Sequence, residues 1–333
     1  NLGTVTNVLV GGVQATIQAS GANWVRITMP AAGSAGVKDI VIQGDSDIEL
    51  AGAYTVNPAG QIGRLSRNPI AGGGYHSLGL KSDGTVVAWG YDYYGQATVP
   101  APNTDFAAVF GGRYHSLGLK SDGTIVAWGR NNYGQTTVPA PNANFVAAIG
   151  GEGHTLGLKT DGTIVAWGLN DWGQATVPAS NTNFVAVAAG YDHSLGLKSD
   201  GTIVGWGENA LGQTTVPAPN NNFVAVAAGF YHSLGLKSDG TVVGWGNNSD
   251  GQLNVPAPNT NFVAVAAGMN HSVGLKADGT IVVWGANTQG QLDVPAPNTN
   301  FIAIAAGDIH SLGLRADGTI AAWGRDVEGQ RDV

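Results

Sequence analysis

The sequence predicts an all-β protein whose larger part is a seven-bladed β-propeller. The first observation is a repeat of 39 residues that occurs seven times without a slip. Each copy carries one histidine, at His76, His115, His154, His193, His232, His271 and His310. Each copy also carries one tryptophan, at Trp89, Trp128, Trp167, Trp206, Trp245, Trp284 and Trp323. The second observation is that every copy offers four short strand-like runs and no helical pattern. A fixed period of this length indicates a repeat architecture.

The fifth copy shows how one repeat divides into strands. Residues 223–228 form an apolar run that is too short for a helix and is typical of a strand buried on both faces. Residues 233–237 alternate as a second strand, and Ser-Asp-Gly at 238–240 supplies the positive φ of a hairpin turn. Residues 241–245 are the expected third strand. Residues 252–255 are a weaker fourth strand that ends at a proline.

The repeat length and its residues favour a propeller over other repeat folds. A β-solenoid uses shorter repeats, and a helical solenoid needs a period of 3.6 residues that this chain lacks. Blades of a propeller stack face to face, so both faces of an inner strand are covered. The small residues of the Val-Ala-Val-Ala-Ala runs suit the crowded centre, and the tryptophans suit the wider gaps further out.

The repeated motif resembles the regulator-of-chromosome-condensation repeat. It reads Ala-Ala-Gly-x-x-His-Ser-Leu-Gly-Leu, then Asp-Gly-Thr-Ile-Val-x-Trp-Gly, then Gly-Gln, over residues 67–333. Copies two and three depart slightly, with Phe110 and Ile149 where a small residue is usual. The compact form with Gly-Gln-Thr-Thr-Val-Pro is closest to bacterial members, which include secreted inhibitors of β-lactamase. The resemblance implies the seven-bladed fold, and a fold does not by itself imply a function.

Residues 1–60 lie outside the repeat and are expected to form a separate small domain before the propeller of residues 61–333. Their strand-like runs resemble the later part of a TIG-type immunoglobulin-like β-sandwich, at residues 5–10, 13–17, 24–29, 38–42 and 51–58. Such a domain normally has further strands before Asn1, so we expect an incomplete sandwich that belongs to a longer chain or is completed by other material. An incomplete sandwich exposes a strand edge, which allows self-assembly with another chain.

The two ends of the propeller predict how the ring closes. Residues 67–72 stand where the other copies have an inner strand, and the last copy stops at Val333 without a following one. We therefore expect residues 67–73 to complete the blade that the C-terminus begins.

Two windows differ between the copies, whereas the Ser-Asp-Gly turns and Pro-rich connections hardly change. The first window precedes the histidine, at residues 74–75, 113–114, 152–153, 191–192, 230–231, 269–270 and 308–309. The second follows Trp-Gly, at residues 91–94, 130–133, 169–172, 208–211, 247–250, 286–289 and 325–328. Because strands alternate in direction within a blade, both windows should lie on one face of the ring. We call this the variable face.

Aromatic side chains gather in these windows and form the predicted ligand-binding surface. The candidate residues are Tyr75, Tyr91, Tyr93, Tyr94, Tyr114, Tyr133, Trp172, Tyr191, Phe230 and Tyr231. Exposed aromatic residues offer a large contact area at low entropic cost, and they suit a protein or a glycan partner. Acidic residues lie among them, at Asp92, Asp171, Asp192, Glu208 and Asp250. The alternative is drift, in which loop tips accept any residue and the tyrosines pack against neighbouring loops.

Composition and motifs exclude several classes of function. The net charge of −8 argues against a nucleic-acid surface, which needs clustered Lys and Arg. No apolar run approaches the length of a membrane span, so no membrane insertion is expected. Seven histidines in one repeated niche are expected to be structural, bonded to loop backbone, rather than metal ligands or catalysts. No catalytic pair or phosphate-binding loop is present, so we expect no enzyme activity and no cofactor or metal.

The sequence therefore favours a non-catalytic interaction module at the cell surface or outside the cell. The chain starts at Asn1 rather than Met, as expected of a mature or trimmed product. Its partner would be a protein or a glycan. The alternative is a secreted enzyme inhibitor of the β-lactamase-inhibitor type that uses the same face. A nucleotide-exchange or chromatin role fits the acidic balance poorly, and a glycan-acting enzyme lacks a catalytic pair.

Overall fold

The computed structural model describes residues 69–333 together with the backbone of seven strands in the first 68 residues. These strands are β1 (Asn7–Val10), β2 (Val13–Gln14), β3 (Thr16–Gly21), β4 (Trp24–Thr28), β5 (Gly36–Gln43), β6 (Ile48–Val56) and β7 (Ile62–Arg64). One sheet has the order β2-β1-β5-β6-β7, and β3 pairs with β4. The predicted runs are strands, and β7 extends the first sheet past residue 60. The immunoglobulin-like arrangement stays a prediction.

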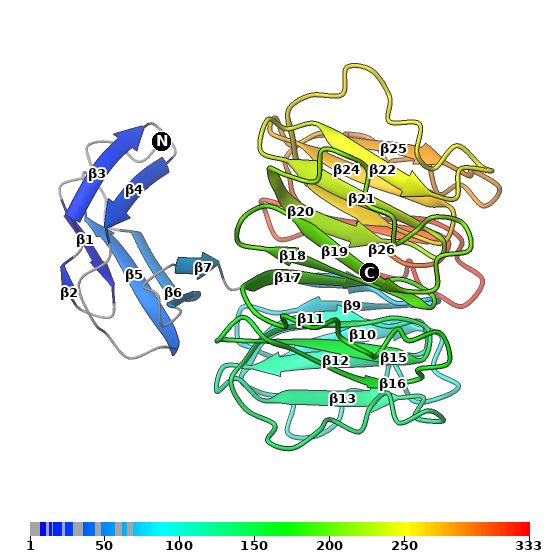
Figure 1. Ribbon diagram of the computed structural model, residues 1–333, viewed down its shortest axis with the longest axis horizontal. Coiled ribbons are helices and arrows are strands. Elements are labelled where there is room, and N and C mark those ends of the chain that lie inside the picture. Colours follow the sequence, from blue (N-terminus) through cyan, green and yellow to red (C-terminus); the bar gives the residue numbers. More distant parts are fainter. Residues whose placement is uncertain are drawn as a thin grey trace. The chain divides into compact units, whose positions relative to one another are not determined.

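The repeats form seven antiparallel sheets of three strands each, as predicted for a seven-bladed propeller (Figure 1). The inner strands are β8 (Ile70–Gly72), β11 (Phe106–Gly111), β14 (Phe145–Gly150), β17 (Phe184–Ala189), β20 (Phe223–Ala228), β23 (Phe262–Ala267) and β26 (Phe301–Ala306). The middle strands are β9 (His76–Leu80), β12 (His115–Lys120), β15 (His154–Lys159), β18 (His193–Lys198), β21 (His232–Lys237), β24 (His271–Lys276) and β27 (His310–Arg315). The outer strands are β10 (Val86–Gly90), β13 (Ile125–Gly129), β16 (Ile164–Gly168), β19 (Ile203–Gly207), β22 (Val242–Gly246), β25 (Ile281–Gly285) and β28 (Ile320–Gly324).

The hairpin between the middle and outer strands follows from its Asp-Gly-Thr sequence. In the second blade, the backbone N–H and the hydroxyl of Thr124 donate to Oδ1 of Asp122 at 2.9 and 2.7 Å. Gly123 between them has a φ of +81°, which a residue with a Cβ atom adopts only with strain. The turn therefore closes on its own side chains, which explains why it hardly varies between the copies.

The predicted fourth strand is wrong. In the fifth blade, the side chain of Asn259 takes the place of a strand beside the first residue of β22. Its Oδ1 accepts from the N–H of Val242 at 2.8 Å, and its Nδ2 donates to the carbonyl of Val242 at 2.9 Å. The N–H of Leu253 meanwhile bonds the Asn248 side chain at 2.9 Å. Side chains thus bond the backbone groups that pairing with a fourth strand would have used, and residues 252–255 form a turn and loop.

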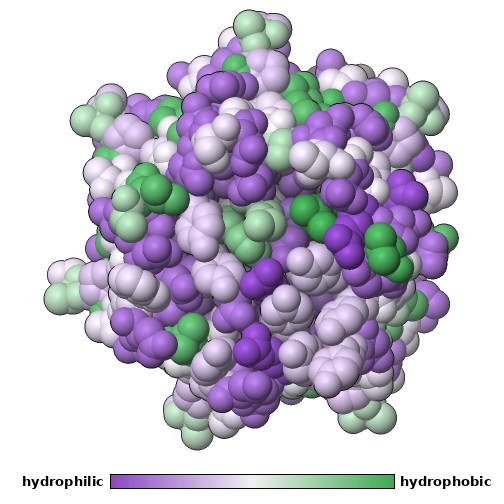
Figure 2. Space-filling view, turned by 90° about the vertical axis from the view of Figure 1, so that its right-hand side faces the viewer, coloured by the Kyte–Doolittle hydropathy of each residue, from purple (hydrophilic) through white to green (hydrophobic). Residues whose placement is uncertain are grey.

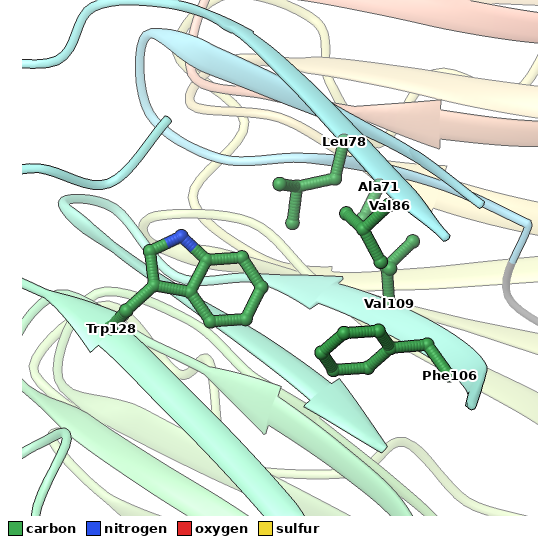
Figure 3. Packing of buried hydrophobic residues seen from close by; sticks show 6 residues of the cluster. All are labelled: Ala71, Leu78, Val86, Phe106, Val109 and Trp128. Carbon is green, nitrogen blue, oxygen red and sulfur yellow. The ribbon is translucent and has the colours of Figure 1, made fainter. Parts of the chain in front are cut away.

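Hydrophobic residues fill the space between neighbouring blades. Leu78 and Val86 of the first blade face Phe106, Val109 and Trp128 of the second, and all are buried (Figure 3). The exposed fraction of Leu78 is 0% and that of Trp128 is 7%. The same arrangement recurs between later pairs of blades, so each blade buries one sheet face against the next.

A ring of hydrogen bonds between side chains joins every blade to the following one. Nε2 of His115 lies 3.0 Å from the hydroxyl of Thr155, and the same bond recurs around the ring at 2.7–3.0 Å. The hydroxyl of Thr155 donates in turn to the carbonyl of Gln135 at 2.9 Å, so its oxygen must accept from the imidazole N–H. The histidines are structural, but they bond a hydroxyl of the next blade instead of the predicted loop backbone.

Glycine makes room for each imidazole. A Cβ atom on Gly112 would lie 2.1 Å from Cε1 of His115, so no larger residue fits beside the ring. Each histidine is fully buried, and its Nδ1 has no hydrogen-bond partner among the described residues. Protonation would place a charge and an unpaired N–H in this position, and the neutral form is therefore favoured.

The ring closes differently from the prediction. Strand β8 pairs with β9 in the first blade, and the last blade has its own three strands, so the two ends do not share a sheet. The last blade is joined to the first by the carbonyl of Gln330, which accepts from Ser77 and from Nε1 of Trp89, both at 2.9 Å, and by Nε2 of His310, 3.0 Å from the hydroxyl of Ser77. The same contact joins other neighbouring blades, as where the carbonyl of Gln96 accepts from Ser116 and Trp128, and Gln330 stands in the Gly-Gln motif of the last copy, so the repeat pattern contained this signal.

We expect the free energy of unfolding to decrease steeply as the pH falls below the pKa of an exposed histidine. Burial lowers the pKa of each of the seven histidines from 6.5 to about 3 or about 4. The unfolded chain then binds more protons than the folded one between these values, and each histidine removes about 1.4 kcal/mol of stability per pH unit. Buried Asp192 and Asp308, whose pKa values are raised to about 6, oppose this trend. The seven histidines outnumber these two carboxyl groups, so the net effect of lower pH is destabilising.

Urea unfolding from pH 7 to pH 4 would measure the free energy of unfolding. Stability that stays constant over this range would contradict the role given to the histidines.

Removal of the closing loop should destabilise the whole ring. A chain truncated after Glu328 loses the Gln330 carbonyl and leaves the first blade without two hydrogen bonds, and we expect a loss of about 2 kcal/mol or more. A chain that lacks only Asp332 and Val333 is the control, because it keeps that carbonyl. Calorimetric melting of both chains tests this, and equal melting temperatures would disprove the proposed closure.

Candidate interaction surface on the variable face

Both windows of each repeat lie at the same end of the blade, as predicted. The first residue of the second window donates its N–H to the last residue of the first window. Arg130 bonds the carbonyl of Tyr114 at 2.9 Å in this way, and Glu208 bonds that of Asp192 at 2.8 Å. The Asp-Gly turns lie at the opposite ends of the strands. The variable residues thus form one continuous face built on invariant strands.

The centre of this face is a small depression around the propeller axis. It has a volume of about 110 Å³ and is lined by glycines together with Arg113, Glu152, Tyr191, Phe230 and Asp308. Backbone bonds link the first windows of neighbouring blades around it, such as Glu152 N–H to the Tyr191 carbonyl at 3.3 Å. Figure 2 shows one face of the propeller, with small hydrophobic residues at the centre and hydrophilic residues over most of the surrounding surface.

Five tyrosines of the first two blades form a connected cluster. The ring centroids of Tyr75 and Tyr114 are 6.2 Å apart, and those of Tyr94 and Tyr114 are 5.7 Å apart. Tyr91 and Tyr93 stack at 6.3 Å, and Tyr93 meets Tyr94 edge to face at 4.9 Å. Contacts of this kind stabilise aromatic pairs beyond their buried area. The alternative in which tyrosines pack against neighbouring loops is therefore partly correct for this group.

A second cluster joins Tyr191, Phe230 and Tyr231 of the fourth and fifth blades. The rings of Tyr191 and Phe230 are 4.9 Å apart, and those of Tyr191 and Tyr231 are 5.8 Å apart. The guanidinium of Arg113 bridges the two clusters, because it lies 5.0 Å from the ring of Tyr114 and 4.8 Å from that of Phe230. Cation–π contacts of this geometry are attractive. The aromatic residues thus belong to one packed arrangement across the axis.

Two ion pairs hold the arginines in place. Nε of Arg113 lies 3.2 Å from Asp308, and Nη1 of Arg130 lies 2.9 Å from Glu152. Burial raises the pKa of Asp308 to about 6, although the guanidinium of Arg113 opposes the rise. The pair is therefore buried at a cost and depends on both partners being present.

The predicted site residues differ in what they can offer a partner. Tyr93 is 77% exposed and Trp172 is 60% exposed, with Tyr133 and Tyr94 also exposed. Tyr75, Tyr91, Tyr114, Tyr191 and Tyr231 are half-buried. Phe230 is buried beneath its neighbours and supports the surface from below.

Sequence reasoning missed two kinds of contributor to this face. Leu211 and Val327 lie in the second window and are 49% and 75% exposed, yet a search for aromatic residues passes over them. Arg113 and Arg130 were also missed, because their importance comes from rings and carboxylates on other blades. The position just before the invariant Gly-Gln would have revealed Leu211, since it follows Tyr94, Tyr133 and Trp172 there.

The charges on the face leave an acidic excess around the fourth blade. Burial raises the pKa of Asp192 to about 6, and the carboxylates of Glu152, Glu208 and Asp171 add to the rise. Nε2 of Gln174 donates to Asp192 at 2.9 Å and only partly offsets these effects. Within residues 69–333, no group of three or more side chains is arranged to hold a metal ion.

The repeat itself matches a known family over most of the propeller. The regulator of chromosome condensation (RCC1) repeat matches at residues 70–96, 106–135, 146–174, 184–213, 223–252, 262–291 and 301–330. The chain belongs to the RCC1-repeat family. No curated protein sequence matches it.

Solved structures of other RCC1-like propellers are similar to this chain. The ectodomain of the receptor kinase CR4 from Physcomitrella patens is 24% identical with a TM-score of 0.66, over 77% of this chain and 72% of that one. The ectodomain of ACR4 from Arabidopsis thaliana is 26% identical with a TM-score of 0.63, over 77% and 95%. Prp20p from Saccharomyces cerevisiae is 19% identical with a TM-score of 0.65, over 75% and 83%. At these identities the likeness supports the fold.

Loss of Arg113 should expose the cost of the buried ion pair. Arg113→Met leaves the carboxyl of Asp308, which is 7% exposed, without its cation, and we expect a loss of about 3 kcal/mol of stability. Arg113→Met combined with Asp308→Asn should recover part of this loss. Arg325→Met is the control, since its partner Glu328 is more exposed and the expected loss is below about 1 kcal/mol. Urea unfolding of the parent chain and the three variants measures these losses, and equal losses for both arginines would refute the prediction.

Proposed function

We propose that this RCC1-repeat propeller is a non-catalytic interaction module that binds a protein partner through its variable face. The observation that supports this most directly is the exposure of large aromatic side chains there, with Tyr93 77% and Trp172 60% exposed. Exposed aromatic residues on a rigid scaffold are typical of binding hot spots. Because the rest of the face is already packed and bonded, little ordering is needed on binding.

The family supports an interaction role. RCC1-repeat propellers are typically interaction or exchange-factor proteins without catalytic activity. The structure of Prp20p is described with its binding properties to Gsp1p and histones. CR4 and ACR4 are ectodomains of receptor kinases. A glycan remains the second class of partner for the same aromatic side chains.

We further propose that the chain acts outside the cell or at the cell surface. The likeness to receptor-kinase ectodomains supports this location. In the described residues, no helix is long and apolar enough to cross a membrane. The N-terminal strands would be a TIG-type immunoglobulin-like domain that spaces the propeller or joins subunits through an open strand edge.

The alternative function is enzyme inhibition of the β-lactamase-inhibitor type. The bacterial form of the repeat motif supports it, whereas the residues that would select an enzyme lie in the windows and point to no target. Inhibition of a class A β-lactamase at nanomolar concentration would favour this function over the first.

Protein and glycan arrays probed with the labelled chain test the proposal. We expect protein ligands whose signal falls by about tenfold in the variant Tyr93→Ala/Trp172→Ala, because exposed aromatic anchors dominate such interfaces. Val263→Ala is the matched control, since Val263 is 53% exposed and lies in β23, outside the two windows. Both variants should melt like the parent. If only glycans bind and their signal falls in the same variant, the partner is a glycan and not a protein. Ligands whose signal is unchanged in the variant would refute the proposal.

A further inference from the structure

One position of the second window carries exposed apolar residues in one half of the ring. The residue before Gly-Gln in the second window is apolar in the first four blades and polar in the last three. The four apolar residues, here called the apolar row, are Tyr94, Tyr133, Trp172 and Leu211, with exposed fractions of 38%, 43%, 60% and 49%. The equivalent residues of the other blades are Asp250, Gln289 and Glu328.

The backbone of this position is the same in apolar and polar blades. The N–H of Trp172 donates to Oε1 of Gln174 at 2.9 Å, and the N–H of Asp250 donates to Oε1 of Gln252 at 2.9 Å. The scaffold therefore accepts a polar residue here without any change of structure. Because nothing in the fold requires an apolar side chain, exposure of four in succession indicates a surface that becomes covered.

Charge distinguishes the same part of the face. The arginines of the windows all pair within the chain, Arg113 with Asp308, Arg130 with Glu152 and Arg325 with Glu328. Five carboxylates of the windows take part in none of the ion pairs in the described part of the chain, namely Asp92, Asp171, Asp192, Glu208 and Asp250. The cations of the face are thus neutralised, and its remaining charge is negative.

Three of these carboxylates lie beside the apolar row in the third and fourth blades. Gln174 accepts from the backbone of Trp172 and donates to Asp192, and so connects the two residues through a single amide group. The N–H of Glu208 bonds the carbonyl of Asp192 at 2.8 Å, and Leu211 follows in the same window. The mutual repulsion of Asp171, Asp192 and Glu208 is part of what raises the pKa of Asp192. A cation placed among them would relieve this repulsion.

We propose that the apolar row is the docking site of a protein segment that carries Lys or Arg beside aromatic or aliphatic side chains. Its apolar residues cover Trp172 and Leu211, and its cations face Asp171 and Glu208, with the buried carboxylate of Asp192 behind them. The footprint is limited to the first four blades, so the polar half of the ring stays free. This inference rests on the proposed function and adds to it the chemistry of the partner and the location of the contact.

Three synthetic peptides test the inference on the full chain. They share the same leucines and tryptophans and carry lysines, serines or glutamates between them. Fluorescence polarisation should show the lysine peptide binding at least about tenfold more tightly than the glutamate peptide, as a few ion pairs would give. Added salt should reduce this difference.

Variants locate the contact. Trp172→Ala and Leu211→Ala should each weaken binding of the lysine peptide by about fivefold or more. Glu208→Gln should weaken binding of the lysine peptide and leave that of the serine peptide unchanged. Val327→Ala, which truncates a residue of the last blade that is 75% exposed, is the matched control and should change nothing.

The outcomes separate the two proposals. If all three peptides bind equally and Trp172→Ala still abolishes binding, the variable face binds partners but the inference about a cationic partner is wrong. If binding responds to Val327→Ala and not to the apolar row, the footprint is wrong. If the lysine peptide fails to bind, or binds without any dependence on the variable face, the inference is overturned.

Discussion

The bond from each histidine to the hydroxyl of the next blade is the contact on which the ring depends. It joins each blade to the next, and the series closes where Nε2 of His310 lies 3.0 Å from the hydroxyl of Ser77. Each hydroxyl passes the bond on to a glutamine carbonyl, and the tryptophan of the same blade donates to that carbonyl too. One repeated set of polar contacts therefore joins strands, blades and connecting loops.

This arrangement requires neutral imidazole in a fully buried place. The hydroxyl can donate only one proton, which it gives to the carbonyl, so the histidine has to be the donor. Nδ1 is then left without a partner beside a glycine whose missing side chain makes the space. The protein accepts this unsatisfied atom in every blade, because hydrophobic packing of each sheet against the next supplies the larger share of stability.

The sequence predicted what depends on period and composition, and missed what depends on individual polar contacts. Seven blades, the inner and middle strands and the position of both windows on one face followed from regular repeats. The prediction of a fourth strand is wrong because an asparagine side chain makes the hydrogen bonds that the strand would have made, as Asn259 does with Val242. The prediction of ring closure is wrong because it assumed a shared sheet, whereas the contact is made by the carbonyl of Gln330 in the last Gly-Gln motif. Of the aromatic residues, Tyr93 and Trp172 are exposed as expected, whereas Phe230 is buried and packs against Tyr191 and Arg113 from other blades.

The variable face can change without altering the scaffold, because the scaffold depends on the backbone groups of the window residues and the face depends on their side chains. The windows contribute backbone groups to the fold, as in the bond from Arg130 N–H to the Tyr114 carbonyl, and leave their side chains unconstrained. Where side chains do interact, as around Arg113, they form cross-blade pairs that fix the surface before any partner arrives. A partner then meets a face that is already ordered, and less of the interaction energy is lost to immobilising it. The repeated interior is thus what allows loop positions of variable sequence to form a defined binding surface.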